Sequence, residues 1–167
     1  DVILKRIKEG ASKELVISIR KEEDKALRNE LKKKLPSICF SGQFNKRADA
    51  SLVLYSGLVC LDFDGYLKQR DLLSDKAKFA KNKYVYSVFI SPSGKGLKVI
   101  VRVPPIPENH VGYFNALEKH FKSKYFDKTS KNISRVCYES YDPLIEINKN
   151  SKIWETFEEL EYKEVNA

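Results

Sequence analysis

The chain of 167 residues has the length of one ordinary domain, and we expect residues 1–167 to form a single domain. Hydrophobic residues make up 42% and charged residues 32%, which supports a folded core and excludes a disordered polar chain. Lys and Arg number 31 against 23 Asp and Glu, so the formal net charge of +8 favours a polyanionic partner such as nucleic acid or nucleotides.

Several classes of protein are disfavoured by what the sequence lacks. No apolar run approaches the roughly 20 residues that span a bilayer, and no signal peptide opens the chain, so we expect a cytoplasmic location. The cysteines Cys39, Cys60 and Cys137 form no CxxC pair, which favours buried free thiols. Only His110 and His120 could supply imidazoles, so we expect no His-based zinc site. Because the chain contains no methionine, we expect it to be a fragment of a larger protein.

The first half of the chain predicts alternating helices and strands. Residues 15–19 favour a strand, and the charged residues 21–35 predict a helix with a narrow apolar stripe that ends before Pro36. The run LVCLDFD at 58–64 predicts a buried strand, and residues 67–80 predict a helix.

The second half predicts an antiparallel hairpin followed by a helix. Residues 84–90 and 97–103 are rich in strand formers, and the turn-forming SPSGKG joins them. Asn109 is placed to cap a helix with apolar residues at helical spacing. Three shorter elements complete the chain: a strand at 135–138, a short segment at 144–147, and a helix from Trp154. The order of elements predicts an α+β fold with an antiparallel hairpin.

Asp62 and Asp64 end the predicted strand at 58–64. Residues two apart in a strand face the same side, so both carboxylates project together while Leu61 and Phe63 face a core. Two adjacent carboxylates repel unless a cation neutralises them, and a hard ion such as Mg²⁺ takes oxygen ligands. The alternative is a pair of solvated acids at a strand end.

The connector Ser91–Gly96 offers hydroxyls, backbone N–H groups and the charge of Lys95, which together suit phosphate oxygens. The alternative is an ordinary glycine-rich hairpin turn. On the strand that follows, Lys98 shares a face with Ile100 and Arg102.

A third group of polar residues follows the predicted helix that Asn109 begins. Asp127 supplies another carboxylate, and Arg135 supplies a planar cation for phosphate or a base. Asp142 competes with Asp127 for the role of third acid, although it also fits a turn before Pro143.

The ordered strings LVCLDFDG, ISPSGKGLKVIV and FDKTSKNISRVCYESYDP resemble the motifs of the archaeo-eukaryotic primase-polymerase superfamily. The resemblance covers about residues 30–145 and is closest to the primase-like N-terminal domain of virulence-associated-E-type proteins of bacteria, phages and mobile elements. It implies an RRM-like primase-polymerase core, a mainly antiparallel sheet flanked by helices.

The resemblance also implies roles for individual residues. Asp62, Asp64 and Asp127 would be the catalytic acids and the ligands of Mg²⁺ or Mn²⁺. Contacts to the nucleotide are implied for Ser91, Ser93, Gly94, Lys95, Gly96, Lys98, Asn132 and Arg135. Lys98 stands where the family has a histidine, so this chain departs from the pattern there.

The function implied is a metal-dependent nucleotidyltransferase, a primase or polymerase in the DNA replication of a mobile element or phage. Its partners would be a single-stranded DNA template, nucleoside triphosphates and a helicase domain of the parent protein. The first alternative is a catalytically silent module that binds nucleic acid or nucleotide within a primase-helicase. The second is a haloacid-dehalogenase-like phosphatase, which the string LVCLDFDGYL also resembles, although Tyr66 stands where that family has threonine.

Overall fold

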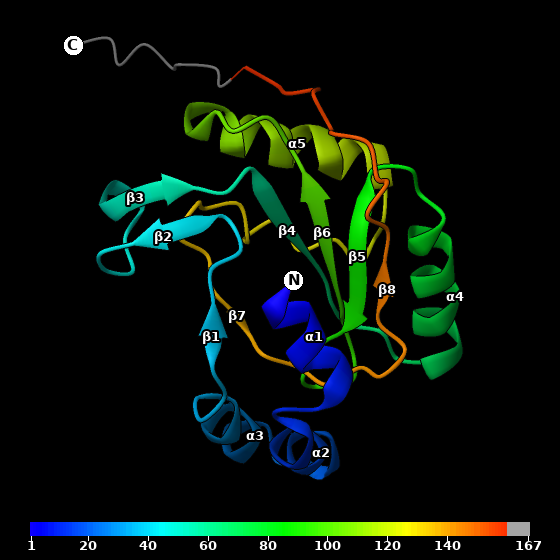
Figure 1. Ribbon diagram of the computed structural model, residues 1–167. Coiled ribbons are helices and arrows are strands. Elements are labelled where there is room, and N and C mark those ends of the chain that lie inside the picture. The colour runs from blue at the N-terminus through cyan, green and yellow to red at the C-terminus, as the bar shows by residue number, and fades with distance from the viewer. Residues whose placement is uncertain (160–167) are drawn as a thin grey trace, which may run out of the picture.

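A computed structural model describes residues 1–159 as an α+β fold with antiparallel sheets flanked by helices (Figure 1). The α-helices are α1 (Val2–Glu9), α2 (Lys13–Lys21), α3 (Lys25–Lys32), α4 (Gln69–Ala80) and α5 (His110–Phe121). The strands are β1 (Ser37–Ile38), β2 (Gly42–Phe44), β3 (Leu52–Tyr55), β4 (Leu58–Phe63), β5 (Val85–Ile90), β6 (Leu97–Arg102), β7 (Cys137–Tyr138) and β8 (Glu146–Ile147). Two short 3-10 turns are η1 (Asp49–Ser51) and η2 (Pro107–Asn109).

The central sheet has the strand order β4-β6-β5-β8, and every neighbouring pair in it is antiparallel. The register of β4 against β6 places Asp62 of β4 opposite Lys98 of β6. On the free side of β4, a segment after α5 pairs with the strand end through an antiparallel bridge between Phe63 and Phe126. Its two backbone hydrogen bonds run from Asp64 N to the Tyr125 carbonyl and from Asp127 N to the Asp62 carbonyl, each 2.8 Å long.

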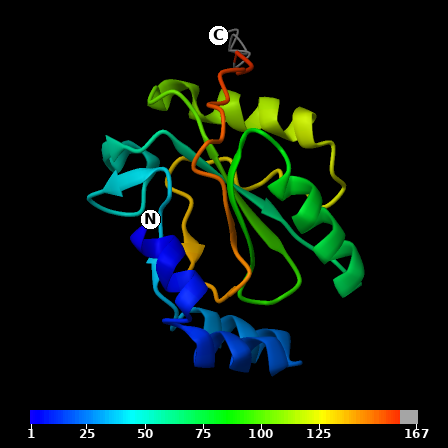
Figure 2. The ribbon, with the colours of Figure 1, turned by 45° about the vertical axis from the view of Figure 1, so that its right-hand side comes forward.

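The alternation of side chains along β4 and β6 divides the core between the two faces of the sheet. Leu61 and Phe63 are fully buried with residues of α4 and α5 on one face. Ile100 and Cys60 belong to the opposite face, where they pack with residues of α1 and β7. Figure 2 shows α1 on one side of the sheet and α4 and α5 on the other. Asp62 lies on the face of Cys60, away from α4 and α5.

The strongly patterned segments form the predicted elements. The strand at 58–64, the hairpin of 84–90 with 97–103, and the helix at 67–80 are confirmed with slightly shorter bounds. The predicted strand at 135–138 shrinks to the two residues of β7, and the short segment at 144–147 contains the two-residue strand β8.

The prediction of a strand at 15–19 was wrong, because these residues belong to α2. Val16 and Ile19 are three residues apart, so both lie on one helical face, and both are fully buried. The β-branched content suggested a strand, but burial of this helical face decides the conformation. The predicted helix at 21–35 exists only as α3, and none of its side chains is buried.

Two details at the ends of elements also differ from the prediction. Asn109 stands before α5 but makes no capping hydrogen bond with its side chain, because η2 leads directly into the helix. The helix predicted from Trp154 is absent over residues 154–159, and its remainder lies outside the described residues. No described helix combines the length and apolar character that a membrane crossing requires.

Candidate metal centre

Three carboxylates meet at the end of β4 that lies near the hairpin turn. Asp62 and Asp64 come from β4 and the residue after it, and Asp127 comes from the segment that pairs with this strand end. One oxygen from each carboxylate lies within 4.8 Å of the others. Asp62 is buried, Asp127 is half-buried and Asp64 is exposed, so the group is rooted in the sheet and opens to solvent.

Two cations accompany these acids. Lys98 Nζ donates to Asp62 Oδ1 at 2.7 Å, as the register of β4 and β6 requires. Arg135 Nη2 lies 3.8 Å from Asp62 Oδ2 and 3.8 Å from Asp127 Oδ2. Three carboxylates and two cations leave one formal negative charge. We call these five residues the acid centre.

The environment of the acid centre shifts the pKa values of Asp64 and Lys98. Although Asp64 reaches solvent, the protein atoms around its carboxylate partly exclude water and raise its pKa; Lys98 and Lys32 oppose this shift, and the charges of Asp62 and Asp127 add to it. Burial disfavours the charge of Lys98, but the neighbouring acidic groups, with Asp62 foremost through its charge and its hydrogen bond, together outweigh this effect, and the pKa of Lys98 lies above its ordinary value. Lys98 is therefore a permanent cation within the acid centre at neutral pH.

The structure brings Asp127 rather than Asp142 to the other two acids. Asp142 is buried elsewhere, with one carboxylate oxygen 2.7 Å from Lys76 Nζ. Its carboxylate also accepts hydrogen bonds from Ile90 N at 2.9 Å and Leu144 N at 3.0 Å. Asp142 is thus occupied in holding β5 and the β8 segment together.

The glycine-rich turn adjoins the acid centre at Gly96. A Cβ at this position would lie 2.5 Å from Asp64 Oδ1, 2.8 Å from the Phe63 carbonyl and 3.1 Å from Ser91 Oγ, so only glycine fits. Ser91 and Ser93 are joined through their hydroxyls at 3.1 Å. The turn and the acid pair, predicted from separate stretches of sequence, therefore lie side by side.

Asn132 is a predicted site residue whose side chain makes its contacts within its own loop. Its amide donates to Ser134 Oγ at 3.3 Å, and Ser134 in turn donates through its backbone N and its hydroxyl to Asp49. Asn132 thus helps to fix the loop that carries Arg135. The described contacts of Asn132 do not reach Asp62 or the other acids.

Sequence analysis did not predict that Lys32 of α3 lies within electrostatic range of the acid centre. Burial lowers the pKa of Lys32, the charges of Arg28 and Lys98 lower it further, and Asp64 opposes them. Lys32 is therefore close enough to sense both an acid and a cation of the acid centre. No local pattern signalled this, because the approach depends on how α2 and α3 fold back against the end of the sheet (Figure 1).

Comparison with protein-family models identifies the family of this chain. The family model of the BT4734-like N-terminal domain matches residues 30–145, which is more than half of the chain. The chain belongs to this family. No curated protein and no solved structure shows a significant match to it. In this BT4734-like domain, the acid centre and the glycine-rich turn lie inside the matched region, whereas α1 and α2 precede it.

The donor set of the BT4734-like domain fits a hard divalent cation. All three candidate ligands are carboxylates, which suit Mg²⁺ and Mn²⁺ and disfavour softer ions that prefer nitrogen or sulfur. Ligand oxygens lie about 2.0–2.1 Å from Mg²⁺, so oxygens already within 4.8 Å of one another need only small movements to share one ion. Asp62, Asp64 and Asp127 are therefore able to hold a metal ion.

Proposed function

We propose that this BT4734-like domain is a metal-dependent nucleotidyltransferase of the primase-polymerase kind. The observation that carries the proposal is the meeting of three carboxylates, two cations and the glycine-rich turn at one end of the sheet. This combination provides ligands for a divalent ion beside groups that attract phosphate. Its proposed partners are a single-stranded DNA template, nucleoside triphosphates and a helicase domain of the parent protein.

The topology of the sheet supports this proposal. Along the chain the elements run β4, α4, β5, β6, α5 and then the segment 125–127. Across the sheet, this segment lies beside β4, and β6 separates β4 from β5. With the bridge at Phe126 in the place of the last strand, this order is that of a split β-α-β unit, which supports the proposed RRM-like core.

Each residue has a distinct part in the proposed reaction. A divalent ion would supply charge stabilisation at the phosphate under attack and would lower the pKa of the attacking hydroxyl. Asp62, Asp64 and Asp127 would hold that ion at the strand end. Lys98 and Arg135 would share the negative charge that develops on the phosphate oxygens. Ser91, Ser93 and the backbone of the turn would orient the phosphate chain by hydrogen bonds.

A second function, binding of nucleotide or nucleic acid without catalysis, is favoured by the ion pair between Lys98 and Asp62. The 2.7 Å pair of Lys98 with Asp62 reduces the charge available to attract metal ions. A domain that has lost catalysis but still binds nucleotide or single-stranded nucleic acid would have such a site. A phosphatase of the haloacid-dehalogenase type is less well supported, because β4 lies in an antiparallel sheet, whereas that fold has a parallel one.

The decisive experiment measures incorporation of labelled nucleotides on a single-stranded template with Mg²⁺ or Mn²⁺. The comparison protein is the Asp62→Asn/Asp64→Asn variant, and Asp71→Asn, an acid on α4 outside the acid centre, is the control. We expect products from the wild type and the control and none from the double variant. Nucleotide binding without any products would favour the silent module. Equal synthesis by the double variant would overturn the proposal.

A further inference from the structure

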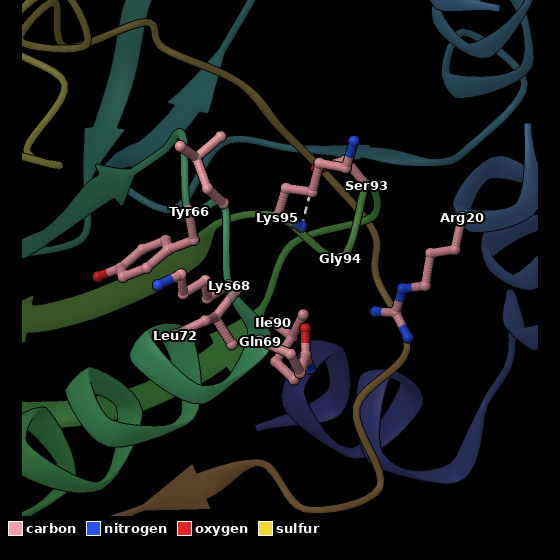
Figure 3. A pocket seen from close by; sticks show the side chains of 10 residues that line it. Arg20, Tyr66, Lys68, Gln69, Leu72, Ile90, Ser93, Gly94 and Lys95 are labelled. Atoms are coloured by element: carbon pink, nitrogen blue, oxygen red, sulfur yellow. Dashed lines mark hydrogen bonds between the residues drawn. The ribbon is translucent and has the colours of Figure 1, made fainter. Parts of the chain in front are cut away.

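A pocket of about 370 Å³ opens beside the glycine-rich turn (Figure 3). Five parts of the chain form its walls: α2, the loop from β4 into α4, the start of α4, the end of β5, and the turn itself. Three of the ten lining residues are cations, Arg20, Lys68 and Lys95, and none is acidic. The pocket is therefore a positively charged hollow beside the acid centre.

Arg20 crosses from α2 to the turn and is held there by two carbonyl groups. Its Nη2 donates to the Tyr141 carbonyl at 2.8 Å and to the Ser91 carbonyl at 3.2 Å. Its Nε is buried and has no hydrogen-bond partner among the described residues. Burial lowers the pKa of Arg20, while the charge of Asp142 raises it. The guanidinium is thus fixed in a partly buried position where its charge is not fully compensated.

The turn is shaped to allow this approach. Gly94 has a φ of +74°, and a Cβ there would lie 3.3 Å from Arg20 Cδ. Both the backbone conformation and the space therefore favour glycine at this position. In Figure 3, the Arg20 side chain extends toward the pocket from the side opposite to Leu72 and Lys68.

The opposite wall adds further groups that suit an anion. α4 is 12 residues long and begins at Gln69, which lines the pocket, and no side chain caps its first turn. Unpaired N–H groups and the helix dipole favour negative charge at such an end, where Asp71 of the same turn already supplies one carboxylate. Lys68 and Lys95 are exposed at the rim, where their flexible side chains are free to turn toward a ligand. Leu67, also at the rim, is 97% exposed, so a ligand larger than a bare anion would cover apolar surface.

We propose that this pocket binds a phosphate group, carried by a nucleotide or by a nucleic-acid strand. The inference rests on the proposed function for the part of the turn and deepens it, because Arg20, Lys68 and Gln69 are not among the residues assigned to nucleotidyl transfer. Arg20 in addition belongs to α2, which precedes the region matched by the family. No metal ion is needed for this binding, so the two proposals can fail separately.

The test measures binding by calorimetry, in the presence of EDTA, with three probes: inorganic phosphate, ATP and a short single-stranded DNA. The test variant is Lys68→Gln/Lys95→Gln, because both side chains are exposed and their loss leaves the packing of Arg20 intact. The control is Lys78→Gln/Lys81→Gln, which removes the same charge at the far end of α4. We expect the test variant to weaken binding by roughly tenfold or more, and the control by less than about twofold.

The pattern across the probes identifies the source of the phosphate. Competition between ATP and inorganic phosphate would identify a nucleotide, and competition by the DNA alone would identify a strand. Phosphate binding that survives in Asp62→Asn/Asp64→Asn would show that the pocket acts independently of the acid centre. No binding by the wild type, or equal binding by the test and control variants, would overturn the inference.

Discussion

Removal of Lys76 from its buried ion pair should destabilise the protein strongly. In the Lys76–Asp142 pair, the side chains are 8% and 3% exposed, and Lys76 Nζ also donates to the Leu144 carbonyl at 2.7 Å. Lys76→Met fills similar space but leaves the Asp142 carboxylate buried without its counter-ion. Breaking such a pair costs about 3–5 kcal/mol in the free energy of unfolding.

The matched control is Lys78→Met, the same substitution two residues further along α4 at an exposed position. We expect it to change stability by no more than about 0.5 kcal/mol. Since 1 kcal/mol moves the Tm of a domain this size by about 2–4 °C, Lys76→Met should lower the Tm by about 6–20 °C. Urea unfolding followed by the fluorescence of Trp154, which is 7% exposed, provides an independent measure.

Adding Asp142→Asn to Lys76→Met removes the uncompensated charge, so the double variant should be more stable than Lys76→Met alone. Equal stability of Lys76→Met and Lys78→Met would refute this reasoning.

The same series of variants distinguishes between Asp127 and Asp142 as the third acid. Asp142→Asn should lower stability and leave Mn²⁺ binding unchanged, whereas Asp127→Asn should weaken Mn²⁺ binding.

Two further predictions concern charge and pH. Lys98→Met should tighten Mn²⁺ binding at least about tenfold in an electron paramagnetic resonance titration, because a cation a few ångströms from a divalent ion repels that ion by about 2 kcal/mol even in water. Lys98→Arg keeps the charge and should leave Mn²⁺ binding nearly unchanged. Unchanged Mn²⁺ binding in Lys98→Met would contradict the charge argument. Burial lowers the pKa of His110 to about 4, below the value of about 6.5 in the unfolded chain, so only the unfolded chain takes up this proton between those values. Stability should therefore fall by about 3 kcal/mol as the pH drops from about 6.5 to about 4. Urea unfolding across this range should show a shallower pH dependence in His110→Gln than in the wild type, and identical slopes would rule out His110 as the cause.

Sequence patterns predicted those parts of the site that one strand or one turn creates. The period of two along β4 placed Asp62 and Asp64 on one face, and the turn residues of Ser91–Gly96 indicated the hairpin. These features depend on neighbours in the chain, so the local pattern was sufficient. The choice between Asp127 and Asp142 was different, because it depends on which distant backbone pairs with the end of β4.

The N-terminal helices show more clearly that local sequence patterns do not predict long-range packing. α2 is rich in β-branched residues, and only packing of Val16 and Ile19 against the rest of the protein makes it a helix. Arg20, which that helix carries to the turn, had no recognisable signal in the sequence. Its position follows from the return of α2 to the hairpin end of the sheet, a long-range arrangement that no periodicity encodes.

The pairing of residues 125–127 with β4 links the assembly of the acid centre to the closure of a sheet edge. The backbone groups of Asp62, Asp64 and Asp127 make the two hydrogen bonds that close this edge, and their side chains converge above it. A cation shared by all three carboxylates would cross-link the edge segment to the central strand. Loss of the pairing would in turn remove one ligand. Ion binding and closure of the sheet edge are then coupled equilibria, so that each stabilises the other by the same free energy.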